Sequence, residues 1–224
     1  MDLNLNNIFI TGTDTGVGKS IFSAVFALSL HHEGKKVCIS KPIQSGSPKD
    51  TDFLAELTGN KISIFNTYSF SLPAAPLISA KHENKEINIE KIISDIKSLE
   101  EKYDCVIVEG IGGIAVPIRN NYLISNLIKD LNYPVVIVAR PTLGTINHSV
   151  LTIEFAKERM LNLLGFVVSG YDETLNDLAV KTAPDVISEL TEIKCLMKIP
   201  MIKEMSFESV NLISKTIASK QYVC

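Results

Sequence analysis

Short, continuously apolar runs alternate along this chain with longer segments in which apolar positions recur every three or four residues. The short runs are rich in Val and Ile and stay apolar at successive positions, which is typical of strands that are covered on both faces. We expect strands at 8–11, 37–41, 105–109, 135–139, 165–169 and 195–199.

The longer periodic segments predict helices between these strands. They lie at 19–32, 51–58, 89–102, 122–130, 146–160, 175–189 and 206–219. Regular alternation of strand and helix predicts βαβ units with right-handed crossovers. The expected fold class is therefore α/β, with a mainly parallel twisted sheet flanked by helices on both faces and a single domain over residues 1–224. Ligands of such folds bind beyond the carboxyl ends of the strands.

The amino-acid composition argues against some classes of binding partner. The 224 residues are 46% hydrophobic and 21% charged, with a formal net charge of −3. This is ordinary for a folded domain and lacks the basic excess of a general nucleic-acid-binding protein. No apolar run approaches the roughly 20 residues of a membrane span, and the first residues lack the regions of a signal peptide. We therefore expect a cytoplasmic protein without nucleic-acid or membrane partners.

The four cysteines are scattered, and no pair of them has the spacing of metal ligands. Cys38, Cys105 and Cys195 lie in or beside apolar strands, whereas Cys224 ends the chain. We expect the first three to be buried free thiols, because cysteine behaves as a small hydrophobic residue.

Residues 12–20, Gly-Thr-Asp-Thr-Gly-Val-Gly-Lys-Ser, join the first predicted strand to the first predicted helix. This order predicts a phosphate-binding loop, because backbone N–H groups and the positive end of the helix dipole face one anion. We expect Lys19 to reach the outer phosphates and Ser20 to ligate Mg²⁺. The first glycine comes one residue earlier than in the usual pattern, and the alternative is a purely structural turn. The loop residues expected at the nucleotide are Thr13, Asp14, Thr15, Gly16, Val17, Gly18, Lys19 and Ser20.

Polar residues also stand where the second and third strands end. Pro42 stops the second strand and leaves Lys41 at its carboxyl end, on the same rim as Lys19 if the sheet is parallel. Two cations on one rim suit an anionic intermediate, whereas a lone lysine at a strand end is usually solvated. Glu109 ends an apolar strand before a glycine loop, which is typical of a carboxylate that binds metal beside a nucleotide. Gly112 in that loop indicates backbone close to a ligand.

The helix predicted at 51–58 is preceded by an acidic stretch, Lys49-Asp50-Thr51-Asp52. Asp50 or Thr51 can cap the helix, because their side-chain oxygens accept hydrogen bonds from its free N–H groups. Asp52 can either belong to this helix start or turn its carboxylate to the metal. The local sequence leaves both interpretations open.

Four segments resemble the dethiobiotin synthetase family in their order and spacing, and the resemblance covers nearly the whole chain. They are 12–20, whose longer spacing is a feature of that family, and 41–46, 108–113 and 143–148. The resemblance implies an ATP- and Mg²⁺-dependent cyclo-ligase of biotin biosynthesis. Such an enzyme forms the ureido ring of dethiobiotin from 7,8-diaminononanoate and CO₂, through a carbamate and a carbamic-phosphoric anhydride.

The resemblance also implies roles for single residues. Lys19 and Lys41 would be the catalytic cations, and Thr15, Lys41 and Ser45 would bind the substrate. Ser20, Asp52 and Glu109 would surround Mg²⁺, and Glu109 and Gly112 would also contact the nucleotide. A further segment would receive the substrate carboxylate at a helix N-terminus, across the interface of a homodimer; the alternative is an ordinary loop and helix cap. This segment comprises Leu143, Gly144, Thr145, Ile146 and Asn147.

One position departs from the family pattern. Ser169 ends a late strand where the family often has an Asn that reads the adenine amino group. Serine lacks the paired donor and acceptor of a carboxamide. Most of the binding energy should then come from the phosphates, which all nucleoside triphosphates share, so we expect ATP to be used with weak preference over GTP or CTP. The residues expected near the base are Ser169, Gly170, Ile199 and Pro200, whose backbone groups can still read adenine.

The main alternative is a P-loop switch ATPase of the partitioning or septum-positioning kind. Such proteins usually carry a lysine five residues before the phosphate lysine, where this chain has Asp14. A GTPase would show an Asn-Lys-x-Asp motif, which the sequence lacks. A related ligase that amidates a large acid would usually be longer and carry a glutaminase domain.

Overall fold

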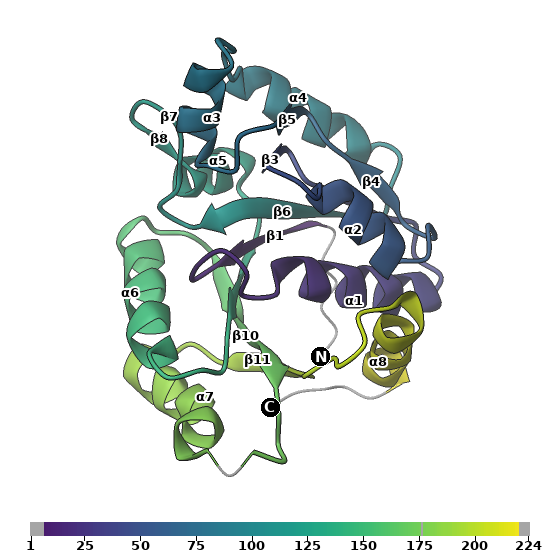
Figure 1. Ribbon diagram of the computed structural model, residues 1–224, viewed down its shortest axis with the longest axis vertical. Helices are drawn as coiled ribbons and strands as arrows, with labels where there is room; N and C mark the ends of the chain where they lie inside the picture. Colours follow the sequence, from purple (N-terminus) through teal and green to yellow (C-terminus); the bar gives the residue numbers. More distant parts are fainter. Residues whose placement is uncertain (1–6, 176, 220–224) are drawn as a thin grey trace.

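A computed structural model describes residues 7–175 and 177–219. At its centre is a seven-stranded sheet in the order β11-β10-β9-β1-β6-β2-β4, and every neighbouring pair of strands in it is parallel (Figure 1). The strands are β1 (Asn7–Gly12), β2 (Val37–Ser40), β4 (Ser63–Phe65), β6 (Cys105–Gly113), β9 (Val135–Ala139), β10 (Leu163–Tyr171) and β11 (Cys195–Pro200).

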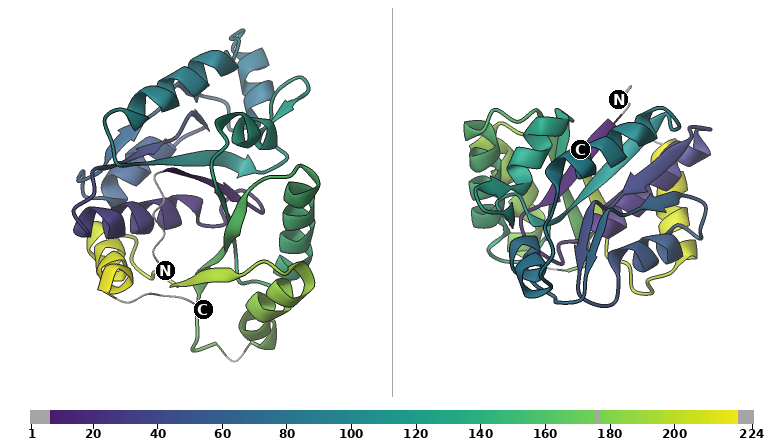
Figure 2. Two further views of the ribbon diagram at one scale, coloured as in Figure 1. Left: turned by 180° about the vertical axis from the view of Figure 1, so that it is seen from behind. Right: turned by 90° about the horizontal axis from the view of Figure 1, so that it is seen from above.

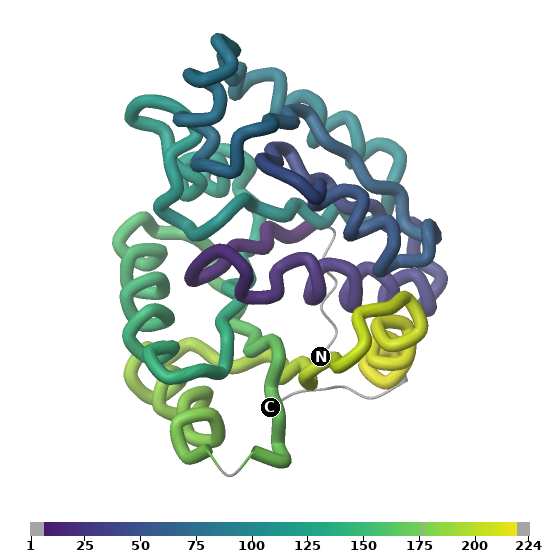
Figure 3. Tube along the Cα trace, viewed as in Figure 1, coloured from purple at the N-terminus to yellow at the C-terminus, as the bar shows by residue number. Residues whose placement is uncertain are grey.

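Helices cover both faces of this sheet (Figure 2). One face packs against α1 (Lys19–His32), α2 (Asp50–Leu57) and α8 (Phe207–Ser219). The other packs against α4 (Ile89–Glu100), α5 (Ile124–Leu131), α6 (Thr145–Glu158) and α7 (Leu178–Thr191). Although α8 comes last among the described elements, it lies beside α1 (Figure 3). Among the described residues, no helix is long and apolar enough to cross a membrane.

Side chains of the central strand alternate between the two cores, as the pleat of a strand requires. Ile8 and Ile10 pack with α1, whereas Phe9 belongs to the opposite core. All three are fully buried. A strand covered on both faces is therefore apolar throughout, and this is the pattern that made β1 recognisable in the sequence.

The six predicted strands and seven predicted helices are confirmed, and their ends differ from the prediction by at most four residues. The α/β fold with a mainly parallel sheet and helices on both faces is also confirmed. The helix predicted from residue 175 begins at Leu178, and residue 176 lies outside the described residues. The start predicted at residue 122 was wrong, because Tyr122 and Leu123 form a short strand before α5.

The elements that the sequence pattern missed are short. They are β3 (Ile43–Ser45), β5 (Tyr68–Phe70), β7 (Pro117–Arg119), β8 (Tyr122–Leu123), α3 (Pro76–His82) and the edge strand β4. The strands among them have only two or three residues, too few to display a period, and α3 has only seven. β3 is nevertheless important, because after Pro42 the chain leaves the main sheet and pairs with β5 instead. This brings residues 41–45 and α2 over the carboxyl edge of β1 and β6.

Candidate active site at the strand ends

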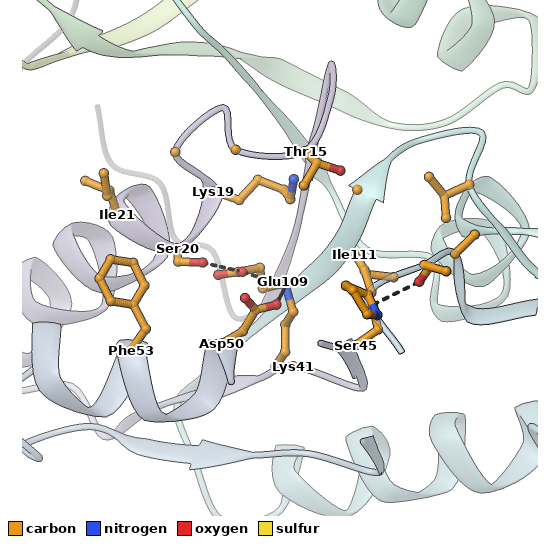
Figure 4. Close-up of a pocket in the computed structure, with 17 residues that line it drawn as sticks. Thr15, Lys19, Ser20, Ile21, Lys41, Ser45, Asp50, Phe53, Glu109 and Ile111 are labelled. Atoms are coloured by element: carbon orange, nitrogen blue, oxygen red, sulfur yellow. Dashed lines mark hydrogen bonds and ion pairs between the residues drawn. The ribbon is translucent and has the colours of Figure 1, made fainter. Parts of the chain in front are cut away.

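A cavity of about 610 Å³ lies at the carboxyl ends of β1, β2 and β6. Four segments line it: the phosphate loop with the start of α1, the chain from Lys41 into α2, the turn at 73–75, and the end of β6 (Figure 4). The predicted site residues among its walls are Thr15, Gly16, Gly18, Lys19, Ser20, Lys41, Ser45, Glu109 and Gly112.

Two glycines give the phosphate loop its shape. Gly16 has a φ of 71° and Gly18 a φ of 97°, in the left-handed region that residues with a side chain rarely adopt. Gly18 has a second reason to lack a side chain, because a Cβ there would lie 2.3 Å from the Ser169 hydroxyl oxygen. The loop thus rests directly against the carboxyl end of β10.

Lys19, the first residue of α1, folds back along the loop. Its Nζ donates a hydrogen bond to the Asp14 carbonyl oxygen at 2.9 Å, and only 7% of the residue is exposed. Burial, helped by the positive charge of Lys41, lowers the pKa of Lys19 to about 8. Within the described part of the chain no carboxylate forms an ion pair with Lys19. This cation can therefore pair with a phosphate.

Three predicted loop residues do not line the cavity. The Asp14 carboxylate forms an ion pair of 2.7 Å with Arg140, which follows β9. Val17 is buried in the core beside α1. The Thr13 N–H donates to the Val138 carbonyl oxygen at 3.0 Å. These contacts fix the loop between β1 and β9, and a role of the three residues at the nucleotide stays a prediction.

Glu109 is the most deeply placed charge of the site, with no exposed surface. Its Oε1 accepts hydrogen bonds from Ser20 Oγ and Lys41 Nζ, both at 2.8 Å, and its Oε2 accepts one from Ser23 Oγ at 2.6 Å. Burial alone would raise the pKa of Glu109. The charge of Lys41 and these hydrogen bonds outweigh burial and lower the pKa below its ordinary value, so the carboxylate is ionised.

Lys41 lies between two carboxylates (Figure 4). Its Nζ is 2.7 Å from Asp50 Oδ2 and 2.8 Å from Glu109 Oε1, and it donates to the Gly110 carbonyl oxygen at 3.1 Å. Burial would lower the pKa of Lys41, but the charges of Glu109 and Asp50 outweigh it and raise the pKa. The lysine is therefore a buried, paired cation and not a solvated residue at a strand end.

Asp52, predicted as a metal ligand, is not part of this cluster. Its side chain is exposed and does not line the cavity, whereas Asp50 does. Residues two apart on a helix point about 200° away from each other, so only one of the two acids can face Glu109. Asp50 is not the N-cap either, because it is already the first residue of α2; the N–H of Thr51 donates to Gln44 Oε1 at 3.0 Å.

Even without Asp52, the oxygen donors of the cavity suit Mg²⁺. Ser20, Asp50 and Glu109 offer hydroxyl and carboxylate oxygens around one point beside the phosphate loop, and Mg²⁺ prefers such ligands. The described residues contain no group of three or more His, Cys, Asp or Glu side chains that could hold a metal. One or two carboxylates completed by phosphate oxygens and water are typical of Mg²⁺ sites at nucleotides.

Two further groups of predicted residues lie outside the cavity. In the segment 143–147, Leu143 is 88% exposed and Gly144 has a φ of 92° before α6 begins at Thr145; Ile146 and Asn147 follow in its first turn. The residues predicted at the base stand on the other side of the phosphate loop, where Ser169 pairs in register with Ile199 and Tyr171 with Pro200; Gly170 lies between them. Within one chain, therefore, both groups lie outside the cavity that holds the two lysines.

Two residues of the site were missed by sequence reasoning. The local sequence indicates only a capping role for Asp50. Ser23 was not considered, although it is three residues after Ser20 and therefore on the same face of α1. Two serines at this spacing on a largely apolar helix are a signal that could have been used; in the structure Ser23 is buried and Ser20 is half-buried.

Comparison with known proteins extends these observations. A family model described as an AAA domain matches residues 6–209. The ATP-dependent dethiobiotin synthetase of Thermodesulfovibrio yellowstonii is 35% identical over 219 residues, which cover 90% of this chain and 91% of the relative. That of Methanococcus vannielii is 43% identical over 164 residues, which cover 72% of this chain and 78% of the relative.

Solved structures agree on the fold. A ParA family ATPase from Chlorobium tepidum superposes with a TM-score of 0.60 at 18% identity, covering 96% of this chain and 97% of that chain. Such a likeness concerns the fold alone and confirms the expected P-loop NTPase architecture. It does not extend to activity, because function resides in the site and not in the fold.

Proposed function

The chain belongs to the ATP-dependent dethiobiotin synthetase family, and from this premise we propose how its cavity carries out the ring closure. The enzyme is an ATP-dependent ligase of biotin biosynthesis. The proposed substrates are 7,8-diaminononanoate, CO₂ and ATP, with Mg²⁺ as cofactor and the cytoplasm as the place of the reaction. The observation that carries the proposal is the convergence of Lys19, Lys41 and Glu109 on one cavity beside a phosphate loop.

In the proposed reaction one amine of the diamine captures CO₂ and loses a proton, which gives a carbamate. A carbamate oxygen attacks the γ-phosphorus of ATP, the bond to the ADP oxygen breaks, and a carbamic-phosphoric anhydride forms. The second amine attacks the carbonyl carbon of the anhydride, loses a proton and expels phosphate as the ring closes. Each stage places negative charge on small oxygens, so catalysis consists mainly of positioning and electrostatic stabilisation.

The residues of the cavity match these needs. Lys19 and the N–H groups of the phosphate loop face the triphosphate, and Lys41 faces the carbamate and the transferred phosphoryl group. The Ser45 hydroxyl donates to the Ala74 carbonyl oxygen at 2.9 Å. It can therefore act toward the substrate only as an acceptor, which suits an amine N–H. Thr15, on the opposite wall, offers a second hydroxyl.

Ser20, Asp50 and Glu109 are the residues proposed to hold Mg²⁺, together with phosphate oxygens and water. When bound, the ion neutralises charge on the transferred phosphoryl group. Ser169, Gly170, Ile199 and Pro200 are proposed to lie near the base, beyond the phosphate loop from the lysines.

The substrate carboxylate is proposed to bind the segment 143–147 of a second subunit. The free N–H groups at the start of α6 form an anion site, yet they do not line the cavity of their own chain. Leu143 before α6 and Leu151 on α6 are large apolar residues with 88% and 63% of their surface exposed, and exposed apolar residues of this size are often buried between subunits. A homodimer would bring this segment to the partner's cavity.

The proposal is tested by incubating the protein with 7,8-diaminononanoate, bicarbonate, ATP and Mg²⁺ and identifying the product by mass spectrometry. We expect dethiobiotin, with one ADP and one phosphate formed for each ring closed. ATP hydrolysis that proceeds equally without the diamine and yields no dethiobiotin would contradict the proposal and favour a switch ATPase.

A further inference from the structure

The contacts of the Lys41 ammonium leave it no free donor. A lysine side chain has three N–H groups. The Lys41 nitrogen has three oxygens within 3.1 Å: Asp50 Oδ2, Glu109 Oε1 and the Gly110 carbonyl oxygen. Only 2% of the residue is exposed. In this arrangement Lys41 is fully engaged with the protein and has no hydrogen bond to offer a substrate anion.

Glu109 in turn requires a cation beside it. Its carboxylate has no exposed surface, and an ionised carboxylate in the interior is very costly unless it is paired. Ser20 and Ser23 supply hydrogen bonds but no charge. Lys41 is the cation that neutralises this carboxylate in the structure.

The oxygens that hold the ammonium are also the ones that suit a divalent cation. Asp50 Oδ2 and Glu109 Oε1 face each other across Lys41 Nζ, and Ser20 Oγ is 2.8 Å from the same Glu109 oxygen. Glu109 Oε1 already accepts two hydrogen bonds, so a metal ion that binds this oxygen takes the place of a donor, and the charge of the Lys41 ammonium beside it repels the ion. Pairing with Lys41 and direct coordination of Mg²⁺ by the two carboxylates therefore compete.

We propose that Lys41 is the resident counter-cation of the Asp50–Glu109 pair and that a divalent cation entering with the nucleotide displaces it. The exchange keeps Glu109 neutralised in both arrangements. It also releases the Lys41 ammonium, which sits on a flexible four-carbon stem, into a cavity of about 610 Å³. Ser23 binds the other carboxylate oxygen, Oε2, and so holds Glu109 in place during the exchange.

The consequence for the reaction rests on the proposed function. The lysine becomes available to the carbamate only after metal and nucleotide have bound, so binding has a preferred order. The displacement itself does not depend on the identity of the diamine substrate and can be measured without it.

The first test measures binding of Mg²⁺ alone to nucleotide-free protein by isothermal titration calorimetry and by the rise in melting temperature. Lys41→Gln should bind Mg²⁺ at least about tenfold more tightly than the unaltered protein, because the two carboxylates are no longer occupied. Lys19→Gln is the matched control: it removes the same charge from the same cavity, but Lys19 pairs with no described carboxylate. Equal Mg²⁺ affinity of Lys41→Gln and the unaltered protein, or an equal gain in both variants, would overturn the proposal.

The second test uses the unaltered protein and so holds even if Lys41→Gln fails to fold. Amine labelling of Lys41 by reductive methylation is followed by peptide mass spectrometry, with ADP and Mg²⁺ or with ADP and EDTA. Lys41 should be labelled several times faster when Mg²⁺ is present, while the exposed Lys61 keeps a constant rate. An unchanged rate at Lys41 would show that the ammonium stays with Asp50 and Glu109. Neither test involves turnover, so a protein with a different substrate can still pass both.

Discussion

The two lysines of the cavity differ in what they pair with, and this decides what each can do. Lys19 contacts a backbone carbonyl oxygen, and burial lowers its pKa to about 8. Lys41 is held by two carboxylates, and their charges raise its pKa. Two residues of one type on one rim therefore have different energetic roles, since only Lys41 neutralises a buried charge of the fold.

Lys19→Ala and Lys41→Ala should each lower kcat by at least about a hundredfold, as removal of a group that stabilises developing charge does. Their effects on folding should differ. Lys41→Ala leaves Glu109 buried and unpaired, which lowers the free energy of unfolding by about 3–5 kcal/mol. Lys19→Ala should lower the free energy of unfolding by less than about 1 kcal/mol. The free energies of unfolding are measured by urea titration monitored by circular dichroism. Equal stability of the two variants would contradict the role of Lys41 as counter-cation.

At the scale of elements, α1 serves the core and the site at once. Most of its residues are buried, and its apolar side chains pack with β1, β6 and α8. Ser20 and Ser23, one turn apart, instead donate to the two oxygens of Glu109 on β6. The helix therefore orients the carboxylate that β6 supplies, and neither element forms this part of the site alone.

Ser23→Ala should lower the free energy of unfolding by about 1–3 kcal/mol, because Glu109 Oε2 loses a hydrogen bond in a site that water does not reach. Ser29→Ala is the matched control: Ser29 is also buried on α1, but among the described residues its hydroxyl bonds only to the Phe26 carbonyl oxygen of the same helix. The Mg²⁺ concentration that gives half-maximal activity should rise in Ser23→Ala and be restored in Ser23→Thr. Similar losses in both alanine variants would reduce Ser23 to an ordinary core residue.

The contact between β10 and the phosphate loop bears on the base of the nucleotide. Ser169 lies against Gly18, and a hydroxyl cannot read adenine as a carboxamide does. ATP, GTP and CTP should therefore give values of kcat/KM within about tenfold of one another, roughly 1.4 kcal/mol. Initial rates at saturating diamine measure this. A preference for ATP above about a thousandfold would mean that another group recognises adenine.

At the scale of the whole molecule, the two halves of the chain supply different parts of the proposed site. The residues that line the cavity come from the segments that follow β1 and β2, from the end of β6 and from the loop after it, all within residues 15–116. The residues proposed for the base and for the substrate carboxylate come from β10, β11 and the start of α6, in the second half of the chain. The start of α6 does not reach the cavity of its own chain, so the proposed complete site needs two subunits.

Complementation tests this arrangement. A Lys19→Ala subunit and an Asn147→Asp subunit, each inactive alone, should form hybrid dimers with one intact site when they are unfolded and refolded together. Since half of the dimers in an equal mixture are hybrids with one working site of two, about a quarter of the normal activity should return. Refolding each variant separately and then mixing briefly is the control. A fully active monomer in analytical ultracentrifugation would exclude the shared site.

The sequence by itself determined the architecture and the position of the site. Strands buried on both faces are apolar throughout, and helices repeat every three or four residues, so both can be recognised locally. The phosphate loop and Glu109 are equally local, because a turn, a helix start and a strand end lie within a few residues of each other. Elements of two or three residues, such as β3, lack a period and were missed.

The tertiary structure alone decided which side chains meet. Asp50 and Asp52 are equivalent in local sequence, and only the placement of α2 over the strand ends turns Asp50 to Lys41 and Asp52 to solvent. The ion pair of Lys41 with Glu109 joins residues 68 apart in the chain. The sequence placed both on one rim, but whether Lys41 is solvated or buried depends on how closely β2 and β6 pack. Charge pairing in an interior is a property of three-dimensional distance and burial, and neither is encoded in spacing along the chain.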